Sequence, residues 1–116
     1  MQYDSKTPIY LQVINSIKLD IINERIKTGE KLPSSRDLAV QYTINPNTAA
    51  RVYQELEREG VCYTKRGMGT FVTEDESRIR ECRQEMAQGC LNEFLKNILE
   101  LGISKDEAIE MIKTTK

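Results

Sequence analysis

The sequence predicts a mainly α-helical protein with one small β-hairpin. Three observations support this fold class. Apolar residues recur at helical spacing along most of the chain. Alternation replaces that spacing only in residues 61–72, around a glycine-containing break. Helix start and stop signals separate the periodic stretches. The expected order is therefore helix, helix, turn, helix, hairpin, polar boundary, long helix and short helix.

Length and charge allow one modest core, or a small domain with an appendage. The chain has 116 residues, with 17 Lys and Arg against 18 Asp and Glu. Residues 1–73 carry ten basic and eight acidic side chains, and residues 74–116 carry seven and ten. This asymmetry has the sign expected of an anion-binding first part, although ordinary charge scatter explains it equally well.

Several function classes are disfavoured by composition. The chain has no histidine, which removes the commonest general base and metal ligand, and it has no paired-cysteine motif. We therefore expect no enzyme activity, no metal and no cofactor. Three cysteines and the lack of a long apolar run predict a cytoplasmic protein that does not enter a membrane.

The first helix is expected to begin at Thr7-Pro8 and to reach Gly29. Leu32, which precedes a proline, is expected to be extended. Ser34 and Asp37 then form a capping box that opens a short second helix. The turn after it contains Thr43, where many similar turns contain glycine, and this predicts a wider turn. The apolar positions of the two helices are Tyr10, Val13, Ile14, Ile17, Ile21, Ile26, Leu38, Ala39 and Tyr42.

The third helix, in "NPNTAARVYQELEREG", is capped by Asn45, starts at Pro46 and ends before Gly60. On a helical wheel its buried stripe is Ala49, Val52, Tyr53 and Leu56. The opposite side carries Asn47, Arg51, Gln54 and Arg58, flanked by Thr48 and Ala50. Asn, Gln and Arg make bidentate contacts with base edges in a DNA major groove. A merely solvated helix face is the alternative.

The stretch "VCYTKRGMGTFV" forms the hairpin, and its tip carries Lys65, Arg66 and Gly67. Glycines let the backbone approach a ligand, and the arginine suits a minor groove or phosphates. Alone, this would be an ordinary surface turn. Directly after two helices joined by a tight turn, it predicts a winged helix-turn-helix domain over residues 1–73.

Residues 74–116 are expected to form a two-helix C-terminal dimerisation tail. The stretch "TEDES" marks the boundary, and Ser104 with Glu107 caps the last helix. Two such helices cannot bury their apolar faces alone, so we expect a homodimer built on residues 86–99 and 108–112. A clamp on the chain's own winged domain is the alternative. The residues assigned to dimerisation are Met86, Cys90, Leu91, Phe94, Leu95, Ile98, Leu99, Ile109 and Ile112.

Residues 8–72 closely resemble the winged helix-turn-helix domain of GntR-family bacterial transcription regulators. The resemblance rests on "LPSSRDLA", on "NPNTAARVYQELEREG" and on "RGMGTFV". The short helical tail is similar to that of the YtrA-like subgroup. The resemblance implies DNA contacts by Arg36 with its neighbours Ser34 and Ser35, by Asn45, Asn47 and Thr48 in the third helix, and by Arg66 and Gly67 in the wing. Other subgroups have an arginine where this chain has Ala50, so that contact is lost or is supplied by Arg51.

The DNA-binding residues expected from motif and wheel are thus Ser34, Ser35, Arg36, Asn45, Asn47, Thr48, Arg51, Gln54, Lys65, Arg66 and Gly67. The expected function is a cytoplasmic, dimeric repressor that binds a palindromic operator in double-stranded DNA. The subgroup resemblance implies control of a transporter operon and of the regulator's own gene. A protein-interaction adaptor is the alternative. A small effector, if there is one, is expected at the dimer interface.

Overall fold

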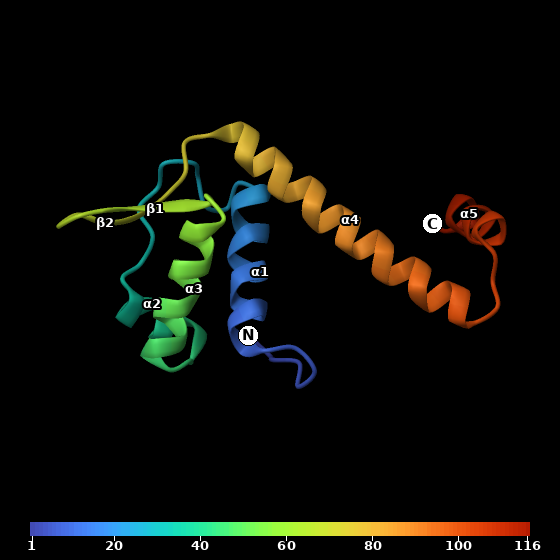
Figure 1. Ribbon diagram of the computed structural model, residues 1–116, viewed down its shortest axis with the longest axis horizontal. Coiled ribbons are helices and arrows are strands. Elements are labelled where there is room, and N and C mark those ends of the chain that lie inside the picture. Colours follow the sequence, from blue (N-terminus) through green and yellow to red (C-terminus); the bar gives the residue numbers. More distant parts are fainter. The chain divides into compact units, whose positions relative to one another are not determined.

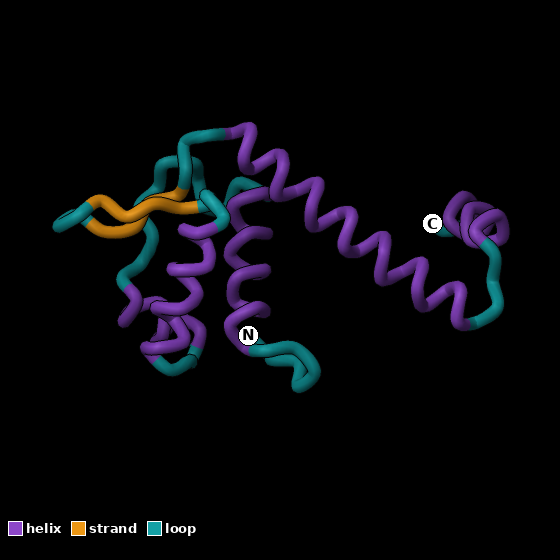
Figure 2. The backbone as a smooth tube through the Cα atoms, viewed as in Figure 1, coloured by secondary structure: helices purple, strands orange, loops and turns teal.

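A computed structural model describes residues 1–116 and contains the expected elements in the expected order (Figure 1). They are α1 (Ile9–Ile22), α2 (Ser35–Tyr42), α3 (Pro46–Arg58), β1 (Cys62–Lys65), β2 (Gly69–Val72), α4 (Glu76–Glu100) and α5 (Lys105–Thr114). The mainly α fold with one antiparallel hairpin is confirmed (Figure 2). No helix combines the length and apolar character needed to cross a membrane.

The chain divides into two compact units, residues 1–82 and 83–116. The division falls later than the boundary expected after residue 73, because the start of α4 packs with the first unit. Cys82 on α4 is only 2% exposed. Arg78, also on α4, donates from Nε to the carbonyl oxygen of Glu59 at 2.7 Å.

Helix α1 is shorter than the sequence suggested. Its N-cap is Pro8, without a side-chain cap, so Thr7 does not fill that role. The helix stops at Ile22, and Glu24 follows in a left-handed conformation with φ 61°. The reason is local, because the N–H groups of Arg25 and Ile26 both turn back to the carbonyl of Asp20. Ile26 is partly buried, but it lies in the loop rather than on the helix.

The core of the first unit forms where α1 and α2 pack on α3 and the hairpin closes one end. The four apolar positions predicted for α3 are buried, as are Leu38, Ala39 and Tyr42 of α2. Burial of a valine or leucine side chain contributes roughly 1.5–3 kcal/mol. The fully buried large side chains are Val13, Leu38, Val52, Leu56, Val61 and Val72.

Both predicted caps of the helix-turn-helix are present, but the predicted wide turn is wrong. Ser34 Oγ accepts the Asp37 N–H at 3.1 Å, and Asn45 Oδ1 accepts the Asn47 N–H at 2.7 Å. Thr43 takes the left-handed conformation (φ 55°, ψ 52°) that glycine usually occupies. Its N–H bonds back to the carbonyls of Ala39 and Val40, so the turn closes tightly despite the β-branched side chain.

The hairpin is paired in register from Cys62 with Val72 to Lys65 with Gly69. The extended segment at residues 31–32 pairs with β2 of the hairpin. Leu32 donates its N–H to the Thr70 carbonyl, and Lys31 forms a β-bridge with Phe71. This pairing follows from the extended conformation expected before Pro33. It places the entrance to α2 directly beside the wing.

The second unit contains the rest of α4, a turn at Gly102 and α5. Ser104 caps α5 by accepting the Glu107 N–H at 3.2 Å, as predicted. Within this unit only Ile98 and Ala108 are buried. Open space surrounds the position where Gly89 would carry a Cβ, so this chain's own packing does not require a glycine there.

Candidate nucleic-acid interface

The outward side of α3 carries polar side chains at its N-terminus and a further one, Gln54, in its second half. The side-chain oxygen of Asn45 accepts the hydrogen bond that caps the helix. The side chains of Asn47 and Gln54 are exposed and have no hydrogen-bond partner in the protein. Thr48 is partly exposed beside Asn47. At the helix N-terminus the N–H groups of Asn47 and Ala49 are bonded to Asn45 and Pro46 has none. The Thr48 N–H is left without a partner in the chain, at a helix end that favours anions. The N-terminal end of α3 therefore offers the Asn47 amide and a helix terminus that favours a phosphate, and Gln54 adds a second amide about two turns further along the helix.

The two arginines on the same side of α3 are engaged differently. The Arg51 guanidinium carbon lies 3.7 Å from the centre of the Tyr10 ring on α1. Arg58 bonds instead to its own helix, with Nη2 2.6 Å from Glu55 Oε2. That hydrogen bond holds the pKa of the Glu55 carboxyl below its ordinary value. Helical spacing placed both arginines opposite the core but could not show these partners.

At the entrance to α2, Arg36 is exposed and forms no ion pair. It borders an open hollow of about 470 Å³, together with Val40, Thr43 and Pro46. The side chain of Ser34 is committed to the helix cap, and Ser35 is partly buried. Arg36 is thus the free cation of this motif, and it lies beside the turn into α3.

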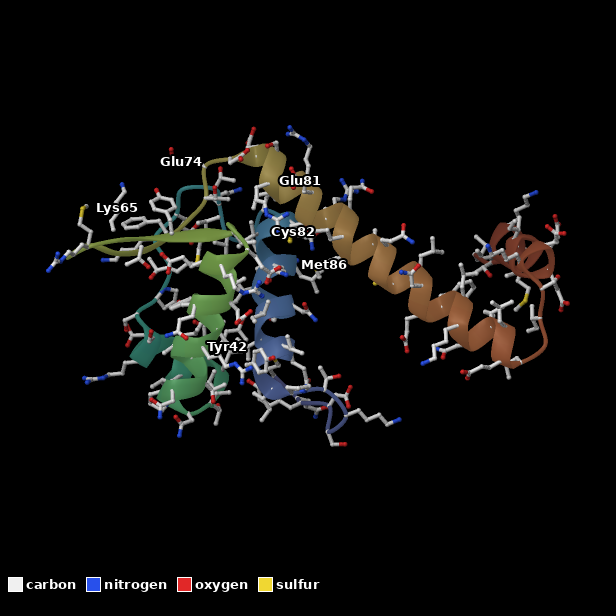
Figure 3. All side chains as sticks on the ribbon, in the orientation of Figure 1. Tyr42, Lys65, Glu74, Glu81, Cys82 and Met86 are labelled. Carbon is white, nitrogen blue, oxygen red and sulfur yellow. The ribbon has the colours of Figure 1, made fainter.

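The wing carries a lysine held over two aromatic rings. Tyr63 and Phe71 stack across the strands with centroids 5.9 Å apart. Lys65 Nζ is 5.0 Å from the Phe71 centroid and 5.7 Å from that of Tyr63, and Figure 3 shows Lys65 on this hairpin. Arg66 and Gly67 are exposed at the tip.

Lys31 is a basic residue of this surface that sequence reasoning missed. A Cβ on Gly69 would lie 2.9 Å from Lys31 Cε, so the missing side chain leaves room for the lysine stem. Gly69 also has φ 123°, which other residues rarely adopt. The available signal was the lysine directly before "LP", in a segment expected to be extended. Its pairing with β2 could not be read from the sequence.

The structure brings the wing and the α2 entrance together around a second hollow of about 550 Å³. Lys31, Ser34, Lys65 and Gly67 all line it. Arg36 instead lies beside the first hollow, toward α3. The residues predicted for dimerisation belong to the second unit.

Residues 9–72 match the family described as bacterial regulatory proteins, gntR family. The chain belongs to this family. YhcF of Bacillus subtilis (strain 168), an uncharacterized HTH-type transcriptional regulator, is 41% identical over 113 residues, covering 97% of this chain and 93% of YhcF. The HTH-type transcriptional repressor YtrA of the same organism is 37% identical over 110 residues, covering 94% of this chain and 85% of YtrA.

Solved structures support the same assignment. A GntR family transcriptional regulator from Listeria monocytogenes superposes with a TM-score of 0.89 at 35% identity, covering 98% of this chain and all of that one. AraR(DBD) in complex with operator ORX1 matches with a TM-score of 0.56 at 28% identity, covering 63% of this chain and 90% of that chain. This gntR-family protein is therefore a DNA-binding transcription regulator and not an enzyme. The expected resemblance to the YtrA-like subgroup is confirmed.

Proposed function

We propose that this gntR-family regulator is a cytoplasmic repressor that binds a palindromic operator as a homodimer. The observation that carries the proposal is a set of exposed cations without ion-pair partners at the entrance to α2 and on the wing. These cations are Lys31, Arg36, Lys65 and Arg66. In a folded protein of net charge -1, basic side chains left unpaired on one surface are available to phosphates.

In this proposal α3 enters the major groove and the wing lies over the adjacent backbone. Asn47, Thr48 and Gln54 read base edges, because amides of this kind pair with adenine and a threonine methyl contacts thymine. Asn45 and the backbone at the start of α3 hold one phosphate. Arg36, near Ser34 and Ser35, holds another, and Lys65, Arg66 and Gly67 follow the backbone from the wing. Lys31 joins them.

The homodimer is proposed because the second unit leaves large apolar side chains uncovered. Leu99 is 53% exposed and Ile112 is 58% exposed, with Leu91, Phe94 and Ile109 also exposed. A second copy would cover them and would place two copies of α3 on the two half-sites of a palindrome. A small effector at that interface would act by favouring one spacing of the two α3 helices.

Repression, rather than activation, is proposed from the relative YtrA, which is a transcriptional repressor. Control of a transporter operon and of the regulator's own gene is proposed from the YtrA-like resemblance. AraR(DBD), whose fold this chain shares, was solved in complex with an operator. This similarity supports operator binding by the first unit.

The proposal is tested by binding to a random-sequence DNA duplex over a series of salt concentrations, followed by selection of preferred sites from a random pool. A DNA-binding regulator releases counterions, so log K should fall linearly with log salt, by about 0.9 per phosphate contacted. The selected sites should be palindromes. A protein-interaction adaptor would show almost no slope and no selected site, and that result would reject the proposal.

A further inference from the structure

We propose that Arg51 is a preorganised phosphate clamp and that Tyr10 is the residue that positions it. The inference rests on the proposed function, because it assigns a role within the same DNA-binding surface. Its basis is the stack between α1 and α3, in which the guanidinium carbon of Arg51 lies 3.7 Å from the Tyr10 ring centre.

Stacking uses the face of a guanidinium and leaves its edges free. Arg51 has five N–H donors in the plane of the group. It forms no hydrogen bond and no ion pair with any other residue of the chain. Arg58, on the same helix, has its donors on Glu55 instead. Arg51 is therefore the α3 arginine whose donors are all available to a ligand.

The direction in which Tyr10 holds Arg51 favours phosphate over base. A helix with side chains is about 10–12 Å across, and it nearly fills a major groove about 12 Å wide. Side chains that point to the groove floor meet base edges, whereas those drawn to a flank meet the sugar-phosphate wall. Tyr10 belongs to α1, which packs along one side of α3, so the stack draws Arg51 to a flank.

Tyr10 contributes by ordering the arginine before DNA arrives. A free arginine side chain has many rotamers and loses that freedom on binding, which weakens the complex. Because Arg51 is stacked on Tyr10, its rotamer freedom is already lost during folding and is not lost again when DNA binds. The phosphate then meets a fixed donor edge of the kind that makes bidentate charge-assisted hydrogen bonds.

The experiment measures binding of the full chain to a random-sequence duplex over a salt series. Arg51→Ala should reduce the salt slope by about 0.9 and weaken binding about tenfold. Tyr10→Leu retains the charge, so its slope should stay at the wild-type value while binding weakens roughly two- to tenfold. Tyr10→Phe keeps the ring and should bind like wild type. Arg25→Ala removes a loop charge paired with Asp20 and serves as the charge-matched control.

The double variant Tyr10→Leu/Arg51→Ala separates positioning from general damage. If Tyr10 acts through Arg51, the double variant should bind no worse than Arg51→Ala alone. An additional loss in the double variant would overturn the assignment of Tyr10. An unchanged slope in Arg51→Ala, or a loss confined to one selected site, would overturn the phosphate role. Wild-type protein without salt-dependent binding would reject the proposed function itself, and this inference with it.

Discussion

The phenolic hydroxyl of Tyr53 on α3 donates a hydrogen bond to the carbonyl oxygen of Pro33, 2.5 Å away. The bond joins α3 to the residue just before the cap of α2. Burial is the largest cause that raises the pKa of Tyr53 well above its ordinary value, followed by the neighbouring Cys62 thiol. Tyr53 therefore sets how α3 lies against the entrance to α2.

Tyr53→Phe should lower the free energy of unfolding by about 0.5–1.5 kcal/mol, because the Pro33 carbonyl loses its partner while the ring still fills the core. DNA affinity should fall as well, since Arg36 lies close to the loosened segment. Urea denaturation and DNA titration measure the two effects. Tyr63→Phe is the control, because the Tyr63 hydroxyl has no hydrogen-bond partner in the protein. Equal stability of the two variants would show that the Tyr53 bond contributes little.

Thr43→Gly should stabilise the protein. A side chain in the left-handed region costs about 1–2 kcal/mol, and glycine avoids this while losing about 0.5–1 kcal/mol through the freedom of its unfolded chain. The net gain should therefore be at most about 1.5 kcal/mol, seen as a higher melting temperature. Thr43→Ala keeps a Cβ and should gain less. If both variants unfold below the wild-type temperature, the turn is not strained at Thr43.

Arg36→Ala and Arg66→Ala should each weaken binding to all DNA sequences and lower the salt slope by about 0.9. Both residues are exposed and lack ion pairs, so their charges are not already neutralised by the protein. Titrations at several salt concentrations give the slope. A variant that binds less tightly but keeps the full slope would show that its arginine does not contact the backbone.

Removal of residues 83–116 should give a monomer with much weaker operator binding. The truncation belongs after Cys82 because that residue is buried in the first unit and Arg78 bonds to Glu59. In the full chain, Leu99→Lys should also dissociate the dimer. Leu101→Lys is the matched control, since Leu101 is 74% exposed and is not assigned to the interface. Sedimentation distinguishes the outcomes, and a stable dimer of residues 1–82 would refute the role of the tail.

The free energy of unfolding should fall as pH rises above ~9. Burial raises the pKa of the Cys62 thiol to about 12 from 9.0, and the nearby Glu57 carboxylate adds to this shift. The unfolded chain therefore loses this proton before the folded protein does, and stability falls by up to ~1.4 kcal/mol per pH unit between those values. Cys62→Ala should have a shallower slope between pH 9 and 10. Identical slopes would mean that the thiol does not titrate with unfolding.

The local features of this protein were readable from its sequence. Ser34, Asn45 and Ser104 cap helices through bonds that span two or three residues, so short motifs specify them. The buried stripe of α3 follows from helical period alone. The turn at Thr43 shows the limit, because a composition rule predicted a wider turn. In the structure the backbone accepts the left-handed conformation there.

The sequence by itself determined the helix order, the caps of α2, α3 and α5, the hairpin and the residue types that face away from the core, since all of these depend on neighbours along the chain. Only the tertiary structure decided which outward residues are free. Arg51 meets Tyr10 from another helix, and Lys31 lies over Gly69 from another segment. The two residues of each pair are far apart in sequence, and no helical or strand periodicity connects them. Their pairing exists only once the hydrophobic core has brought α1, α3 and the hairpin together.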